Sequence, residues 1–147
     1  MADISTVWSP LIGAADWQQQ GPLLASGNDL ETAILISLFT DRIAGQADAI
    51  PDGTGDPRGW CCDDPARPIG SRLWLLRRAK QTTETANRAR DYIVEALQWL
   101  IDDGAVIKFD VRVQWIGPGQ LGAWVVAHRA DGTKAALQYD WAWKGMN

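Results

Sequence analysis

Histidine and cysteine, which commonly carry catalysis or bind metals, are sparse in this chain. His128 is the only histidine, and Cys61 and Cys62 are the only cysteines. A zinc site needs several nitrogen or sulfur ligands, and a nucleophilic cysteine needs a base within hydrogen-bond reach, so one histidine far from the thiols supports neither. We therefore expect two free thiols that act as small apolar groups, and an ordinary exposed histidine on a strand. The sequence predicts no cofactor and no metal site.

Carboxylates are the remaining candidates for chemistry, because two of them can serve glycoside hydrolysis. Glu95, Asp102 and Asp103 offer such pairs, but any acidic chain does, and a sequence does not give their separation. Asp102 and Asp103 come at the predicted end of a helix, where the helix dipole disfavours negative charge. Two explanations stay open. Either this helix end is solvated, or the two acids pair with a basic group of this chain or of a partner.

Two further segments resemble ligand-binding loops only superficially. The run from Asp52 to Asp56 lacks the additional oxygen ligands and the distal glutamate of a calcium-binding EF-hand, so it is interpreted as a turn-rich segment. The Gly70-Ser71-Arg72 block lacks the glycine spacing and the lysine of a phosphate-binding loop.

Composition narrows the classes of partner. The 147 residues carry a formal net charge of -4, whereas a groove that follows phosphates needs clustered lysine and arginine, so nucleic acid is not expected as a partner. No apolar run approaches the ~20 residues of a membrane span, and the start, MADISTVWSP, shows no secretory signal, so we expect a cytosolic protein. The nine tryptophans are the outlying feature: they are large core residues, or some of them are anchors of an interface.

Hydrophobic periodicity predicts an α+β fold in one domain of residues 1–147, divided into 1–27, 28–103 and 104–147. Residues 1–27 are expected to be extended, with a short hairpin formed by 4–8 and 14–18. A nearly all-buried helix is expected to begin at Asn28 or Asp29, either of which can cap it.

The rest of the chain is predicted to contain a long loop, a long helix and three strands. A loop of about thirty residues, 42–70, is unusual in a small domain and is expected to be functional, as a surface shaped for a partner. Residues 71–76 are expected to be helical. An amphipathic helix follows over 83–103, with Gly104 as its C-terminal cap. After Gly104 the period changes to two, which predicts an antiparallel meander from strands near 106–115, 121–129 and 134–141.

The candidate partner-binding residues lie in the loop, at the end of the long helix and on the last strand. Arg58, Trp60, Arg72 and Trp74 are expected to anchor the loop. Both arginines can make bidentate pairs with carboxylates, and Asp102 and Asp103 are candidate acceptors within the chain or across an interface. The last strand and its tail, with Tyr139 and Trp141, are expected to form an exposed edge that can accept a strand from another chain.

Four ordered blocks of this sequence closely resemble the Mu-type phage baseplate protein family. They are DLETAILISLFTDR (29–42), PDGTGDPRGW (51–60), GSRLWLLRRAK (70–80) and ALQWLIDDG (96–104). That family looks related to the small, lysozyme-like baseplate wedge protein of T-even phages. The T-even protein has Glu-Pro-Arg just after its long helix, where this chain has Asp102-Asp103-Gly104.

The resemblance implies a structural role rather than catalysis. Members of this group sit in the inner ring of a contractile-tail baseplate, bind larger wedge proteins and template the first layer of sheath. The implied partners are therefore wedge proteins and the sheath protein, in a hetero-oligomer with six copies per baseplate. The implied location is the virion tail, after assembly in the host cytoplasm. A cell-wall hydrolase acting during infection is the alternative.

Overall fold

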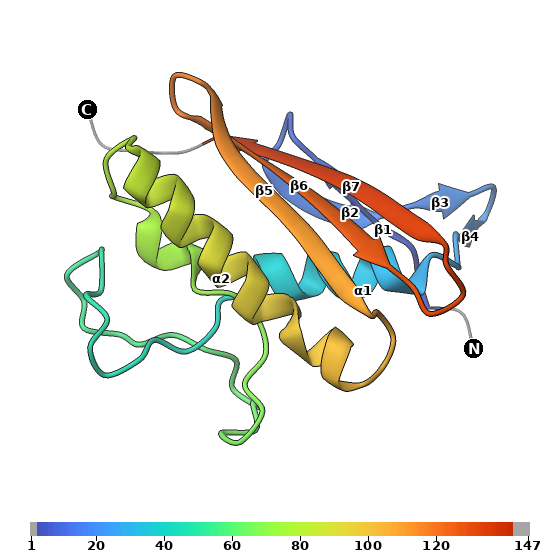
Figure 1. Ribbon diagram of the computed structural model, residues 1–147, viewed down its shortest axis with the longest axis horizontal. Helices are drawn as coiled ribbons and strands as arrows, with labels where there is room; N and C mark the ends of the chain where they lie inside the picture. Colours follow the sequence, from blue (N-terminus) through green and yellow to red (C-terminus); the bar gives the residue numbers. More distant parts are fainter. Residues whose placement is uncertain (1–2, 143–147) are drawn as a thin grey trace.

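The computed structural model describes residues 3–142, and two helices lie on one face of a three-stranded antiparallel sheet (Figure 1). In chain order the elements are β1 (Thr6–Ser9), β2 (Ala14–Trp17), β3 (Gln19–Gln20), β4 (Leu23–Leu24), α1 (Asp29–Phe39), the 3-10 helix η1 (Leu73–Leu76), α2 (Thr83–Asp102), β5 (Lys108–Gly117), β6 (Gln120–His128) and β7 (Lys134–Ala142). The predicted α+β class is confirmed, with its N-terminal hairpin, buried helix, long loop, long helix and C-terminal meander.

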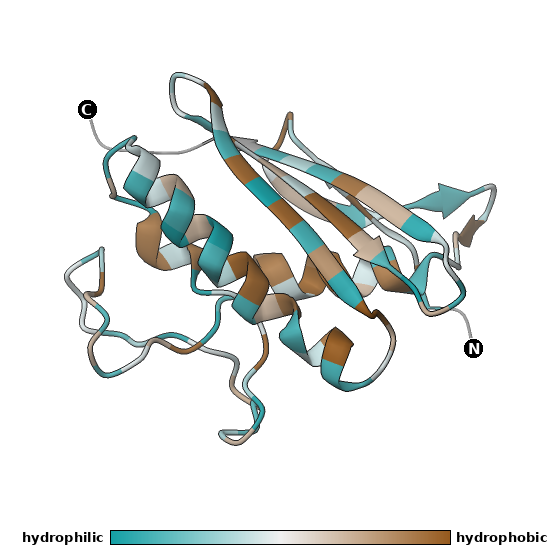
Figure 2. Cartoon of the chain, viewed as in Figure 1, coloured by the Kyte–Doolittle hydropathy of each residue, from teal (hydrophilic) through white to brown (hydrophobic). Residues whose placement is uncertain are grey.

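The sheet has the order β5-β6-β7, and alternation of side chains decides which face is buried. On β6 the side chains of Leu121, Ala123, Val125 and Ala127 are fully buried against the helices. Apolar and polar residues alternate along β5, as the predicted period of two requires (Figure 2). The opposite face of the sheet carries mostly polar side chains.

Helix α2 follows its predicted amphipathic pattern. The Thr82 hydroxyl accepts a hydrogen bond from the Thr85 N–H at 3.1 Å and so caps the N-terminus. Its apolar stripe is buried against the sheet and α1, and consists of Ala86, Ala89, Ile93, Ala96, Leu97 and Leu100. Gly104, just after the helix, has φ +77°. Glycine adopts this left-handed conformation without strain, and helices commonly end at such a residue.

Helix α1 is nearly all buried, as expected, because only Asp29 and Ile36 of its 11 residues are exposed. Ile34, Leu35 and Leu38 face the core, whereas Ile36 is 46% exposed. Position 36 lies about 200° around the helix from Ile34, so an apolar residue there points away from the sheet. This exposed isoleucine lines a surface groove described below.

The N-terminal hairpin is attached to the rest of the fold through Trp8. Its ring stacks on Phe39 of α1, with ring centroids 4.0 Å apart, and its indole N–H donates to the backbone oxygen of Asp140 at 3.0 Å. Phe39 in turn meets Tyr139 edge-on at 5.7 Å. Three segments distant in sequence are therefore joined by one aromatic cluster.

The segment between α1 and η1 contains no helix or strand and extends away from the sheet beside α2 (Figure 1). Its two ends lie together, because Asp41 and Ser71 form a parallel bridge and the Ser71 N–H donates to the Thr40 carbonyl at 2.9 Å. Gly70 at this base has φ +93°, and a Cβ there would lie 2.4 Å from the Thr40 oxygen, so only glycine fits. Within residues 3–142, no helix is long and apolar enough to cross a membrane.

Candidate partner-binding surface

Arg72 fastens the long loop to α2. Its guanidinium donates two hydrogen bonds to the Glu95 carboxylate, at 2.9 and 3.2 Å, and a third to Asp48 of the loop at 3.0 Å. It also lies over the ring of Tyr92, 4.8 Å from the ring centroid. A planar guanidinium can satisfy two carboxylates and an aromatic face at once, which the point charge of a lysine cannot do.

Arg58 holds the loop at a second point. It pairs with Asp41 at 2.7 Å and with Asp52 at 3.3 Å, and it stacks over Trp74 at 4.5 Å. The buried Trp74 donates its indole N–H to the Arg42 carbonyl at 2.8 Å. Within the chain, then, the carboxylates paired with the two arginines come from the loop and α2 rather than from Asp102 or Asp103, which lie at the far end of that helix.

The loop carboxylates have pKa values that report these contacts. Burial alone raises the pKa of Asp48, but hydrogen bonds from the Gly45 N–H and from Arg72 outweigh it, and the pKa lies below its usual value. Hydrogen bonds from the Thr54 hydroxyl and N–H, reinforced by Arg58, lower the pKa of Asp52 to about 2. Both acids are therefore charged at neutral pH and hold their arginines.

The remaining predicted residues near the loop are more exposed. Trp60 is 52% exposed on the loop, and Asp103 pairs with Arg67 at 3.0 Å in an open ion pair. Asp102 accepts a hydrogen bond from Gln98 at 2.9 Å. One of the two explanations left open for the helix end therefore has structural support, since a basic group of this chain meets Asp103.

Tyr139 and Trp141 are the two predicted partner-binding residues on the last strand. Tyr139 faces the core and is 3% exposed, and burial raises the pKa of its hydroxyl. Trp141 pairs with Leu121 in the β6–β7 register, and its side chain lies outside the described part of the structure. Tyr139 can thus shape the strand but presents little surface of its own to a partner.

The groups singled out for possible chemistry are separated in space. His128 lies on the polar face of the sheet, only partly exposed, with its Nε2 2.6 Å from Asp110. That contact is the main reason why the pKa of Asp110 is lowered. Cys61 and Cys62 are exposed free thiols on the loop. In the part of the chain that the structure describes, no group of three or more potential metal ligands gathers.

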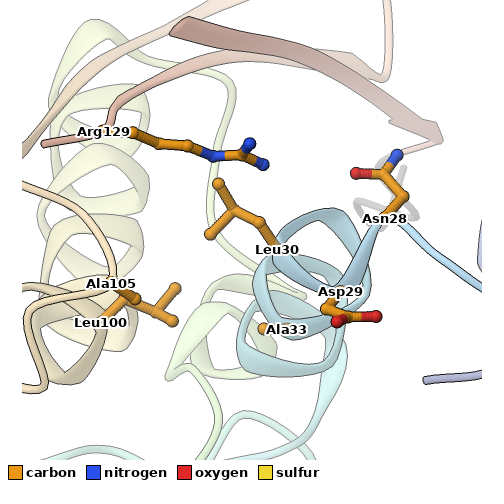
Figure 3. A pocket seen from close by; sticks show the side chains of 7 residues that line it. All are labelled: Asn28, Asp29, Leu30, Ala33, Leu100, Ala105 and Arg129. Atoms are coloured by element: carbon orange, nitrogen blue, oxygen red, sulfur yellow. The ribbon is translucent and has the colours of Figure 1, made fainter. Parts of the chain in front are cut away.

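Two of the hollows on the surface of residues 3–142 lie beside α1. A smaller one of about 670 Å³ lies between the start of α1 and the end of α2, and Arg129 extends over it (Figure 3). A larger one of about 1040 Å³, here called the hairpin groove, lies between the turn of the N-terminal hairpin, α1 and η1. The residues of the hairpin groove used below are Leu11, Ile12, Trp17, Leu35, Ile36, Leu38, Asp41, Trp74 and Arg77.

Sequence reasoning missed three residues of the loop attachment, namely Asp48, Glu95 and Arg67. Glu95 falls on the polar side of the α2 pattern and gives no signal of burial, yet it lies beneath Arg72. The two loop residues are ordinary charged residues of an irregular segment. Their pairing could have been identified only from information on which residues distant in sequence lie close together in the fold.

The two helices, the long loop and the strands β5 and β6 together match a known protein family. A family model described as "Phage protein GP46" matches residues 30–134. The chain belongs to this phage protein family. The resemblance that four sequence blocks suggested is therefore confirmed.

Two relatives give the family its context. The chain is 40% identical to baseplate protein gp46 of Escherichia phage Mu over 147 residues, which cover 99% of this chain and 100% of the relative. It is 38% identical to the Mu-like prophage FluMu protein gp46 of Haemophilus influenzae over 114 residues, which cover 76% and 75% of the two chains. The similarity to the Mu protein thus includes the N-terminal hairpin and β7, which the family model does not reach.

Proposed function

We propose that this GP46-family chain is a structural component of the baseplate wedge of a contractile phage tail. In this role it binds larger wedge proteins and templates the first layer of sheath, in the virion tail, after assembly in the host cytoplasm. The observation that carries the proposal is the 40% identity to the Mu baseplate protein over the whole of both chains. Six copies per baseplate, with no nucleic-acid or membrane partner, complete the proposal.

The attached loop supports a role in binding a protein partner. Long loops that serve as binding surfaces need a scaffold that positions them. Here Arg72 and Arg58 fasten the loop at two separate points, and Trp60 remains exposed between them in sequence. We propose that Arg58, Trp60, Arg72 and Trp74 together present the loop to a wedge protein, with the buried members acting as supports.

We propose the β7 edge of the sheet as the site of strand addition. At the β5 edge the Val111 carbonyl already accepts a hydrogen bond from Arg90 of α2 at 3.3 Å. At the other edge, β7 has no second hydrogen-bonded strand beside it in residues 3–142. The Asp140 carbonyl points outward there, since it accepts from Trp8. Residues alternate in a strand, so Gln138 also presents its N–H and carbonyl to the outside.

We propose that a strand of the sheath protein adds to β7. The test is Gln138→Pro, which removes an outward N–H without removing a β6–β7 hydrogen bond, because the ladder bonds belong to its neighbours. We expect the variant to keep its fold and its wedge contacts but to lose nucleation of sheath on purified baseplates. Normal sheath nucleation by the folded variant would refute strand addition at this edge.

We also propose that the chain is not an enzyme. The three acids considered above for a hydrolytic pair are all engaged in the structure, because Glu95 binds Arg72, Asp102 accepts from Gln98 and Asp103 pairs with Arg67. The purified protein is therefore expected to leave a peptidoglycan suspension turbid. Clearing that a single Asp or Glu substitution abolishes would establish the hydrolase instead.

Co-expression with the neighbouring tail genes, followed by size-exclusion chromatography with light scattering, tests the main proposal. A stable complex with a larger tail protein is expected, and its mass gives the stoichiometry. A monomer that binds none of the tail proteins would contradict the wedge role and would favour a stand-alone binding module.

A further inference from the structure

We propose that the hairpin groove binds an apolar segment of a larger baseplate protein, and that acidic residues flanking this segment pair with Arg77, Arg78 and Lys80. The inference rests on the proposed function and adds to it the chemistry of one partner contact. Two independent features carry it: the apolar surface of the groove and the sign of the unpaired charge at its rim.

The groove exposes large apolar side chains from three elements. Leu11 and Ile12, in the turn of the N-terminal hairpin, are 96% and 69% exposed, and Trp17 on β2 is 62% exposed. Ile36 of α1 faces them, and the floor is formed by buried residues of the core. Soluble proteins rarely expose large contiguous apolar patches, and those that they do expose are commonly interaction sites.

The open shape of the groove favours a polypeptide over a small molecule. Its volume of about 1040 Å³ lies at the upper end of the roughly 300–1,000 Å³ that is usual for pockets that bind drug-sized ligands. The groove is open along the hairpin rather than enclosed, since its walls come from the surface of β1–β2, α1 and η1. A segment of a partner chain can therefore enter it from the side.

Arg77 gives the rim of the groove a positive charge, and two further cations follow it closely in the sequence. Asp41 is the rim carboxylate, and Arg58 already pairs with it at 2.7 Å. Arg77 lines the rim, and Arg78 and Lys80 follow it as exposed residues. None of these three forms an ion pair within residues 3–142. In a chain of net charge -4, a local excess of unpaired cations selects an acidic partner segment.

The same charge argues against a second copy of this chain as the occupant. A two-fold interface places each surface patch against itself. Pairing two hairpin grooves in this way would bring two sets of Arg77, Arg78 and Lys80 together, and like charges in proximity oppose association. An apolar segment bordered by aspartate or glutamate satisfies both features of the groove.

Photo-crosslinking within the co-expressed wedge complex tests which chain occupies the groove. Benzoylphenylalanine is placed at the position of Leu11 or Ile36, and at Leu23 as a control, because Leu23 is 72% exposed and does not line the groove. Mass spectrometry then identifies the crosslinked peptide. We expect both groove positions to reach one apolar peptide of a larger tail protein that contains Asp or Glu, and the control to miss it.

Matched substitutions test the two features separately. Arg77→Glu with Arg78→Glu should weaken binding of the tail protein about tenfold, because each exposed ion pair contributes a factor of a few and reversal adds repulsion. Lys108→Glu, at the start of β5 and outside the groove, should leave the affinity within twofold. Leu11→Ser with Ile12→Ser should weaken binding as well, whereas Leu23→Ser with Leu24→Ser should not.

These experiments distinguish failure of the groove proposal from failure of the proposed wedge role. If the complex forms but the groove positions crosslink to nothing, or to another copy of this chain, the groove proposal is wrong while the wedge role stands. Unchanged affinity of both groove variants would overturn it equally. If no tail protein binds the wild-type chain, the proposed function fails first and the groove proposal fails with it.

Discussion

Replacement of Arg72 by methionine tests whether the long loop is held by a defined set of contacts. The variant keeps an apolar side chain of similar reach beside Tyr92 but leaves Asp48 and Glu95 without their cation. The Arg72 side chain is 26% exposed, and those of Asp48 and Glu95 are 17% and 34% exposed. Breaking a fully buried ion pair costs about 3–5 kcal/mol and an exposed one at most about 1 kcal/mol.

This partly buried network should therefore contribute between those limits. We expect Arg72→Met to lower the free energy of unfolding by about 2–3 kcal/mol. For a chain of this size, that loss corresponds to a fall in Tm of roughly 5–10 °C. Urea unfolding, followed by circular dichroism at 222 nm and by tryptophan fluorescence, measures the change.

Arg67→Met is the matched control, because Arg67 also joins the loop to α2. Its side chain is 68% exposed, and that of Asp103 is 48% exposed, so this substitution should cost less than about 1 kcal/mol. Equal losses in the two variants would refute the reasoning, since burial of the ion pair would then not determine its strength. Full rescue by Arg72→Lys would contradict the bidentate geometry.

Three further perturbations test other parts of the fold. Because the folded-state pKa values of Asp48 and Asp52 are lowered, to about 2 for Asp52, their contribution to stability should be complete above about pH 4 and lost as the pH falls toward 2, measured as proteolysis of the loop. Gly70→Ala adds a Cβ against the Thr40 carbonyl in a left-handed conformation and should lower stability by more than about 3 kcal/mol in urea. Trp8→Phe removes the hydrogen bond to β7 and should cost about 1 kcal/mol in urea and loosen the hairpin in hydrogen exchange.

The regular elements could be predicted because each follows from a local rule. A change of hydrophobic period at Gly104 separates α2 from the sheet, and the period of two that follows it predicts the alternation seen along β5. The helical period before Gly104 predicts the amphipathic α2. These rules use only residues that are close in sequence. They hold because an element with one buried face needs apolar side chains at the period of that face, 3.6 in a helix and two in a strand.

The attachment of the loop could not be predicted in this way. Arg72 was identified as a group that binds carboxylates, but its partners Asp48 and Glu95 lie 24 and 23 residues away in sequence. Many other acids of this chain could have paired with Arg72 equally well, and the secondary-structure propensity of Asp and Glu does not show which of them lies near it. The link from Trp8 to the backbone of Asp140 spans 132 residues and has no local signal either.

Fastening the loop before assembly has a consequence for binding. A loop of about thirty disordered residues would lose much conformational entropy when a partner orders it, at about 1–2 kcal/mol per residue fixed. In this chain the Asp41–Ser71 bridge closes the base of the loop, and Arg58 and Arg72 hold its interior. Most of that entropy is therefore lost on folding, and a partner that docks against Trp60 meets a surface already in place. On this reasoning Arg72→Met should weaken binding to the wedge mainly by loosening the loop, so a partner in excess should restore its protection from proteolysis.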